Sequence, residues 1–232
     1  MLTMTNSLDG QDVTSMVIIY SKRKTLTLHI TEEGKLIVRA PLRTSEQRIL
    51  QFVQKSRGWI WKHQTKARQK QQQIIPKQFV DGEKFLYLGK HLELRVAQTP
   101  NIFLSDFLYL PKEFLTNAKK HLINWYQKMA LEVFEKRVKY HAAKTGLQFT
   151  QIKISKAKHR WGSCSVKNVL NFTWNLIMAP IEVIDYIIIH ELVHTVEKNH
   201  SRNYWNKVAK IMPNYKQQEK WLKENGVFLR LE

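Results

Sequence analysis

The chain has 232 residues and a formal net charge of +19, with 38 Lys and Arg against 19 Asp and Glu. Its hydrophobic fraction of 43% and charged fraction of 25% are ordinary for a globular protein and argue against a disordered chain. A single cysteine, Cys164, excludes an internal disulfide framework and fits a reducing compartment. The polar N-terminus shows no secretory signal, and the apolar runs are too short to span a membrane, so we expect a cytoplasmic protein with no membrane partner.

The positive charge is concentrated in two segments. Residues 43–77 hold nine basic residues and the single acid Glu46, and residues 136–181 hold nine basic residues and no acid. A field of this sign attracts polyanions, so the two segments predict nucleic acid or an acidic partner. The alternative, which is the commoner one for charge runs, is that both segments are solvated basic faces.

The first half of the chain predicts a polar tail over 1–16 and a β-rich N-terminal subdomain over 17–110 with one basic helix. We expect strands over 17–20, 25–30 and 36–38, and further strands within 79–110, from their alternating apolar residues. Between them, Thr44 or Ser45 can cap a helix whose apolar spacing continues into a basic, Gln-rich stretch as far as about Gln73.

The second half, residues 111–232, predicts a helical domain with a small antiparallel sheet. Pro111 is placed to begin a long helix that Gly146 ends. Residues 149–154 and 161–172 are expected to form the sheet, and three further helices are expected to begin near Pro180, Ser201 and Tyr215. The fold class that follows is α+β.

The motif His190-Glu-Leu-Val-His194 lies inside the apolar helix that begins near Pro180. Residues i and i+4 lie on one helix face, so the two imidazoles can share one divalent metal, and Glu191 can act as general base on metal-activated water. With this composition, chance predicts roughly 0.02 such matches. Two core histidines with satisfied hydrogen bonds are therefore a weak alternative for the set.

A catalytic zinc site usually has a third protein ligand. His200 follows His194 by six residues, which would turn it about 240° away from the first two if the helix continued. We expect Lys198 and Asn199 to supply a turn, because Asn tolerates the left-handed conformation. Glu219 or Glu224 from a later helix remains the rival third ligand.

Further short motifs precede and follow this helix in the sequence. They are Arg160-Trp-Gly-Ser-Cys-Ser165, Leu170-Asn-Phe-Thr-Trp-Asn175, Ala179-Pro180, Val183-Ile-Asp-Tyr186, Asn199-His-Ser201 and Tyr204-Trp205, with Ser21-Lys-Arg-Lys24, Val38-Arg-Ala-Pro41, Trp59-Ile60 and Tyr87-Leu-Gly89 nearer the N-terminus. In the order of these motifs, the chain resembles YgjP-like predicted metal-dependent hydrolases. These are zincin-like proteins similar to SprT-like metallopeptidases. The resemblance covers most of the chain from about residue 17. Mild departures are Tyr204, where Phe is commoner, and Val193, where a small residue is usual.

The resemblance implies a zincin-like metallopeptidase domain over 111–232 that binds one Zn²⁺ ion per chain. It implies His190, His194 and His200 as ligands, with Glu191 as general base. The strand at Trp161, Gly162 and Ser163 is a candidate for binding the extended backbone of a peptide or protein substrate by β-augmentation. The alternative for this strand is tight packing, with Trp161 in the core.

The sequence says less about the roles of other residues near the motif. Tyr204, Tyr215 and His159 are candidates to stabilise an oxyanion. Cys164 is expected to be a small buried hydrophobe rather than a metal ligand.

The favoured function is a zinc-dependent hydrolase, specifically a peptidase. The alternative is a DNA-associated basic protein whose metal site acts on DNA-bound proteins or is mainly structural, since some SprT-like proteins act at DNA. A third possibility is a metal-stabilised binding module without turnover.

Overall fold

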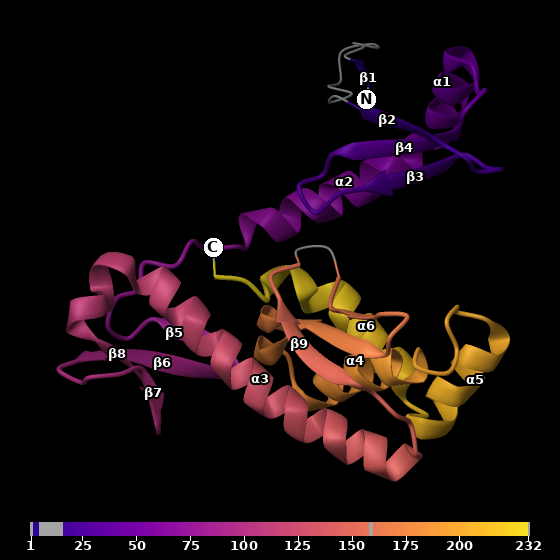
Figure 1. The fold of residues 1–232 in the computed structure, drawn as a ribbon. Coiled ribbons are helices and arrows are strands. Elements are labelled where there is room, and N and C mark those ends of the chain that lie inside the picture. Colours follow the sequence, from indigo (N-terminus) through magenta and orange to yellow (C-terminus); the bar gives the residue numbers. More distant parts are fainter. Residues whose placement is uncertain (1, 5–15, 158–159, 232) are drawn as a thin grey trace. The chain divides into compact units, whose positions relative to one another are not determined.

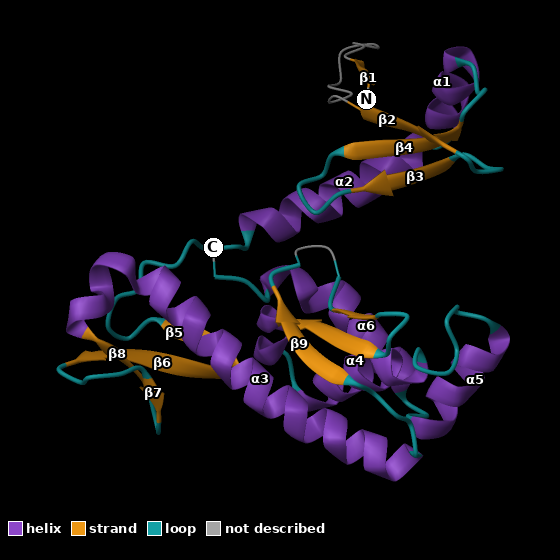
Figure 2. Cartoon of the chain, in the orientation of Figure 1, coloured by secondary structure: helices purple, strands orange, loops and turns teal. Residues whose placement is uncertain are grey.

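The computed structural model describes residues 2–4, 16–157 and 160–231, and the chain divides into two compact units, Met1–Ile75 and Pro76–Glu232 (Figure 1). Both units contain strands and helices in separate runs along the chain (Figure 2), so the expected α+β class is confirmed. None of the described helices combines the length and apolar character needed to cross a membrane. Residues 5–15 of the expected polar tail lie outside the described residues.

The first unit is a mixed four-stranded sheet with two helices. Its strands stand in the order β1-β2-β4-β3, and its elements are β1 (Leu2–Met4), β2 (Met16–Ser21), β3 (Thr27–Ile30), β4 (Leu36–Pro41), α1 (Glu46–Lys55) and α2 (Arg57–Gln72). Alternating side chains of β2 and β4 meet Ile49, Val53 and Ile60 of the helices in a small core of their own. β2 and β4 pair in parallel, and β3 pairs antiparallel with the other edge of β4.

The single helix expected from Ser45 to about Gln73 is wrong, since the structure breaks it at Ser56. Ser45 caps α1 as expected, its hydroxyl accepting a hydrogen bond from the Arg48 backbone N–H. At Ser56 the backbone leaves helical geometry, with φ −99° and ψ 9°. Ser56 is followed closely by Gly58, and such small residues favour a break because they stabilise a helix poorly.

The second unit holds two small sheets and most of the helices. Its first sheet, in the order β5-β6-β8-β7, consists of β5 (Lys84–Tyr87), β6 (Lys90–Ala97), β7 (Phe103–Leu104) and β8 (Leu108–Pro111). The remaining elements are η1 (Lys112–Asn117), α3 (Ala118–Thr145), β9 (Gln151–Ser155), β10 (Gly162–Cys164), β11 (Val169–Thr173), η2 (Trp174–Met178), α4 (Ile181–Val193), α5 (Arg202–Ile211), α6 (Tyr215–Asn225) and η3 (Gly226–Phe228). As expected, Gly146 ends α3 in the left-handed conformation, with φ 73°.

The division between the units falls after Ile75, whereas the sequence predicts a boundary at residue 110. The first sheet of the second unit shares one core with α3, because Phe85, Leu94 and Leu110 are buried in the same cluster as Leu122. The turn after β5 also donates backbone hydrogen bonds to η2, from Leu88 and Gly89 to Ile177 and Met178. These strands therefore pack with the helical part that follows them.

The second sheet is mixed, which corrects the expected small antiparallel sheet. Its order is β10-β11-β9, so β10 and β9 lie on opposite sides of β11. β10 and β11 form an antiparallel hairpin, while β9 runs parallel to β11. The connection from β9 to β10 must pass β11 to reach the other edge, which is why the pairing is not a simple meander.

An ion pair joins α3 to α4. Asp185, a buried acid among apolar residues of α4, accepts a bidentate interaction from the Arg137 guanidinium, with Nε to Oδ1 at 2.7 Å. His141 Nε2 lies 3.1 Å from the same Oδ1. A charge buried in this way needs such partners, because desolvation is costly. The three residues thereby fix the start of α4 against α3.

Replacing Asp185 with Asn should lower the free energy of unfolding by about 2–3 kcal/mol at neutral pH. Burial alone raises the pKa of Asp185, but hydrogen bonds from His141 and Arg137 outweigh burial and hold the pKa below its ordinary value. Such a carboxylate stabilises the fold above its unfolded pKa, and the contribution disappears as pH falls through the lower folded pKa. The difference between wild type and variant should therefore shrink below about pH 4.

Chemical denaturation of both proteins from pH 7 down to pH 3 measures this difference. Asp106→Asn, at an exposed position, is the matched control and should unfold like the wild type. A difference that stays constant over the whole range would contradict the role given to the Asp185 charge.

Candidate metal centre

Helix α4 positions the first two histidines of the motif. Every residue from Val183 to Ile189 is buried, so the helix is held by core packing on several sides. His190 and His194 lie on one face, with ring centroids 5.0 Å apart. The Tyr204 hydroxyl donates a hydrogen bond of 3.0 Å to the His190 backbone carbonyl. The helix that carries the motif is therefore held in place beside the histidines themselves.

The chain turns sharply after α4 and returns His200 to the same face. The turn begins at His194, where Thr195 and Val196 donate backbone hydrogen bonds to Leu192 and Val193. Among the described residues Asn199 is not left-handed, which corrects the expected role of its backbone. Its side chain instead accepts a hydrogen bond of 3.2 Å from the Ser201 N–H, and Ser201 caps α5 as expected.

The three imidazoles converge through their Nε2 atoms. His200 Nε2 lies 3.1 Å from Nε2 of His194 and 3.1 Å from Nε2 of His190. His194 Nδ1 lies 2.9 Å from the Glu197 backbone carbonyl, which can only accept, so Nδ1 carries the proton and Nε2 presents a lone pair. Burial, reinforced by the neighbouring imidazoles, lowers the pKa of His190 to about 3. Burial also lowers the pKa of His194, so His190 and His194 are neutral at pH 7, the form of imidazole that binds metals.

This donor set fits a zinc ion. Zinc binds histidine nitrogen at about 2.0–2.1 Å in tetrahedral geometry, which separates two ligand nitrogens by about 3.3 Å. The observed 3.1 Å is close to that spacing. Among the described residues, neither Glu219 nor Glu224 joins this donor group, and Glu219 lies 2.6 Å from Lys223.

Glu191 is buried against strand β10. Only 4% of its surface is exposed, and the strand approaches so closely that a Cβ at Gly162 would lie 2.6 Å from Glu191 Oε1. Burial raises the pKa of Glu191 to about 8, although the positive charge of Arg160 acts to lower it. Gly162 is therefore required by space rather than by backbone conformation, and a larger residue there would displace the carboxylate.

Strand β10 is an edge strand in the described part of the chain. Trp161 accepts a backbone hydrogen bond from Thr173, and Ser165 donates one to Val169, both at 2.9 Å. Backbone groups alternate in direction along an antiparallel pair. Those of Trp161, Ser163 and Ser165 thus face β11, while the N–H and C=O groups of Gly162 and Cys164 point away from it.

The side chains named as oxyanion candidates have different surroundings. Tyr204 is fully buried, and its hydroxyl is committed to the His190 carbonyl, so it acts as a structural support. Tyr215 stacks on Trp205 at 5.4 Å. His159 lies outside the described residues. Cys164 is half-buried, and burial raises its thiol pKa, in keeping with a packing role.

The Trp161 indole packs on Gly226, where a Cβ would lie 2.7 Å from its Cζ2 atom. Its side chain is partly buried against the main core, as the packing alternative expected.

The sequence did not predict that aromatic rings stack beside the histidines. Trp205 stacks on His200 at 5.6 Å, and Tyr215 continues the stack. Helical spacing from the Ser201 cap would have placed Trp205 in the first turn of α5, near His200. The Glu197 carbonyl that orients His194 was also missed, and a backbone group leaves no signal in the residue types.

Comparison with known proteins agrees with this geometry. The model of the YgjP-like, metallopeptidase domain family matches residues 24–225. The chain belongs to the YgjP-like metallopeptidase family.

The match to the YgjP-like domain includes all three histidines, Glu191 and strand β10, and begins within the first unit. No curated relative matches this YgjP-like chain. It is also similar to the metallopeptidase zymogen abylysin of Pyrococcus abyssi, a solved structure, at 22% identity over 39% of this chain and 93% of that chain. The TM-score is 0.37, and a likeness at that score carries no argument about chemistry.

Proposed function

We propose that this protein is a zinc-dependent metallopeptidase, with one ion bound by His190, His194 and His200. The observation that carries the proposal is the convergence of three Nε2 atoms next to a buried glutamate. The Nε2 atom of His200 lies 3.1 Å from each of the other two. Three histidines leave a fourth tetrahedral position for water or substrate. Membership of the metallopeptidase family supports the same reaction class.

The residues of the chain have separate roles in this proposal. Zinc, when bound, supplies Lewis acidity that activates water and polarises a carbonyl. Glu191 accepts the proton that the water loses and can return it to the leaving amine. The Glu197 carbonyl keeps His194 in the tautomer that presents Nε2. Because Gly162 has no side chain, the Glu191 carboxylate can occupy its position beside strand β10.

Strand β10 is proposed to hold the substrate in an extended conformation. The outward N–H and C=O groups of Gly162 and Cys164 would pair with the peptide backbone, extending the sheet by one strand. Of the expected substrate-binding residues, Gly162 supplies these groups. Trp161 and Ser163 would hold the strand in register, since their backbone groups face β11.

Hydrolysis of a fluorogenic library of extended peptides by the full chain tests the function. Hydrolysis should cease after chelation and return when about one equivalent of Zn²⁺ is added, because zinc is tetrahedrally bound by one set of three ligands. Hydrolysis that survives chelation would contradict the proposal.

Zinc binding without any turnover would favour a metal-stabilised binding module instead. The other alternative is a DNA-associated protein whose metal site acts on DNA-bound proteins or is mainly structural. It rests on the basic segments and on the resemblance to SprT-like proteins, and not on the geometry of this centre. Zinc-dependent turnover would exclude a purely structural metal.

A further inference from the structure

A basic hollow lies within the first unit, whereas the residues of the proposed peptidase centre belong to the second unit. It has a volume of about 740 Å³ and lies between the loop after β2, the loop after β4 and helix α1. Four cationic side chains line it, from Lys24, Arg43, Arg48 and Lys55, and no acidic residue does. On α1 the lining residues Arg48, Phe52 and Lys55 are spaced by four and three, which places them on one helix face.

The four cations have no acidic partner among the described residues. All four side chains are exposed, and none forms an ion pair with a described carboxylate. Residues 16–75 carry 13 Lys and Arg against three acids, so the surrounding field is also positive. Guanidinium groups match phosphate oxygens in bidentate geometry. The hollow is therefore suited to a ligand with several phosphates.

Helix α2 adds features that favour nucleic acid among the polyanions. Its 16 residues include five Lys and Arg and no acid. Trp59 and Trp61 are 43% and 69% exposed, and unpaired bases stack on such rings. The two rings lie about 200° apart around the helix, on either side of buried Ile60. They do not form the continuous apolar face that a helix lying on a membrane needs.

We propose that the first unit binds single-stranded nucleic acid, with the phosphate backbone held in this hollow. Three basic residues of the expected segment 43–77 line this hollow, together with Lys24, which lies outside that segment. Single strands are favoured over duplexes because the exposed tryptophans can stack only on bases that are unpaired. This binding is independent of the proposed peptidase activity.

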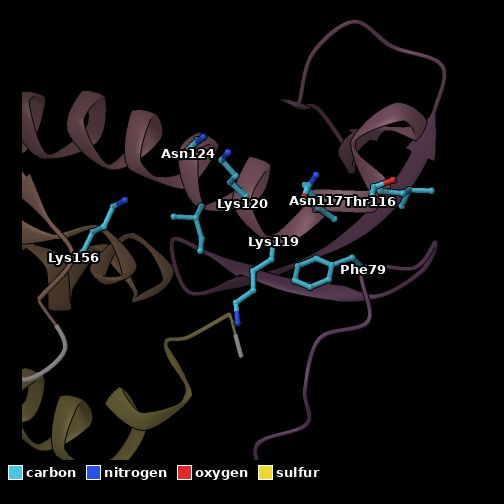
Figure 3. A pocket seen from close by; sticks show the side chains of 10 residues that line it. Phe79, Thr116, Asn117, Lys119, Lys120, Asn124 and Lys156 are labelled. Carbon is cyan, nitrogen blue, oxygen red and sulfur yellow. The ribbon is translucent and has the colours of Figure 1, made fainter.

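The second basic segment offers a poorer site. A hollow of about 560 Å³ lies at the start of α3, and Lys156 is the one residue of segment 136–181 that lines it. Figure 3 shows Lys119 and Lys120 pointing in different directions, with Lys156 reaching in from another segment. Apolar Phe79, Leu115 and Ile123 form much of its wall. No phosphate site is proposed there.

Fluorescence anisotropy of a labelled single-stranded DNA 20-mer, titrated with the full chain at several salt concentrations, tests the proposal. The hollow variant carries Lys24→Gln, Arg43→Gln, Arg48→Gln and Lys55→Gln. The control variant carries Lys90→Gln, Lys112→Gln, Lys128→Gln and Lys216→Gln, all at exposed positions of the second unit, and has the same net charge. Circular dichroism and cooperative thermal unfolding like that of the wild type confirm that both are folded.

The hollow variant should bind the 20-mer at least tenfold more weakly at about 50 mM salt, with a salt slope smaller by about 3. The control variant should stay within about twofold of the wild type. If the fourfold variant does not fold, the single reversal Arg43→Glu should still weaken binding several-fold.

Equal losses in both variants, or no loss in the hollow variant, would overturn the proposal, since net charge alone would then explain the binding. Tighter binding to polyglutamate or to phosphatidylserine vesicles than to the 20-mer at the same salt would also overturn it, in favour of an acidic protein or a membrane surface.

Discussion

The Glu191→Gln variant should lose peptide hydrolysis by a factor of about 10²–10⁴ while still binding zinc. Gln keeps the size of the side chain and therefore the packing against Gly162, but it cannot accept the proton. The three histidines are untouched, so zinc affinity should change little. Single-turnover hydrolysis and zinc titration, measured on the same preparation, separate these two effects.

Glu182→Gln is the matched control for this prediction, because Glu182 is exposed in the first turn of the same helix. It should hydrolyse peptide at the wild-type rate. If Glu191→Gln is as active as Glu182→Gln, Glu191 is not the general base.

The Gly162→Ala variant should lower the rate of hydrolysis roughly a hundredfold, although residue 162 has no side chain that could take part in chemistry. The added Cβ would lie 2.6 Å from Oε1 and 2.7 Å from Cγ of Glu191, so either the carboxylate or the strand must move. A displacement of about 1 Å is enough for a loss of that size. Zinc affinity should fall only a few-fold, because the strand supplies no ligand.

Gly58→Ala provides the same substitution at a position where the new Cβ meets nothing within 4 Å beyond its chain neighbours and its own helix backbone, and it should leave hydrolysis unchanged. Full activity in Gly162→Ala would show that β10 and Glu191 are less tightly coupled than the structure indicates.

The metal-binding pattern could be predicted from the sequence because it depends on helical spacing. His190 and His194 must share a face on any helix, and the structure brings them together on α4. His200 required a turn whose place was expected at Lys198 and Asn199, but the turn begins at His194. Local hydrogen bonds at a helix end are decided by packing as much as by residue type.

Features that depend on contacts between distant segments could not be predicted. The approach of Gly162 to Glu191 joins a strand and a helix whose relative position no local pattern specifies. The pairing of β9 with β11 is parallel for a similar reason, since it depends on which edge the chain reaches. Asp185 did leave a signal, because an acid inside an apolar run of a helix requires a partner, but the sequence did not identify Arg137 and His141.

Titration of the metal-free full chain with Zn²⁺ tests the central claim most directly. The wild type should bind one ion tightly, and His190→Ala, His194→Ala and His200→Ala should each abolish that tight site. Wild-type protein that binds no zinc, or His200→Ala protein that binds it as tightly as the wild type, would contradict the proposed centre.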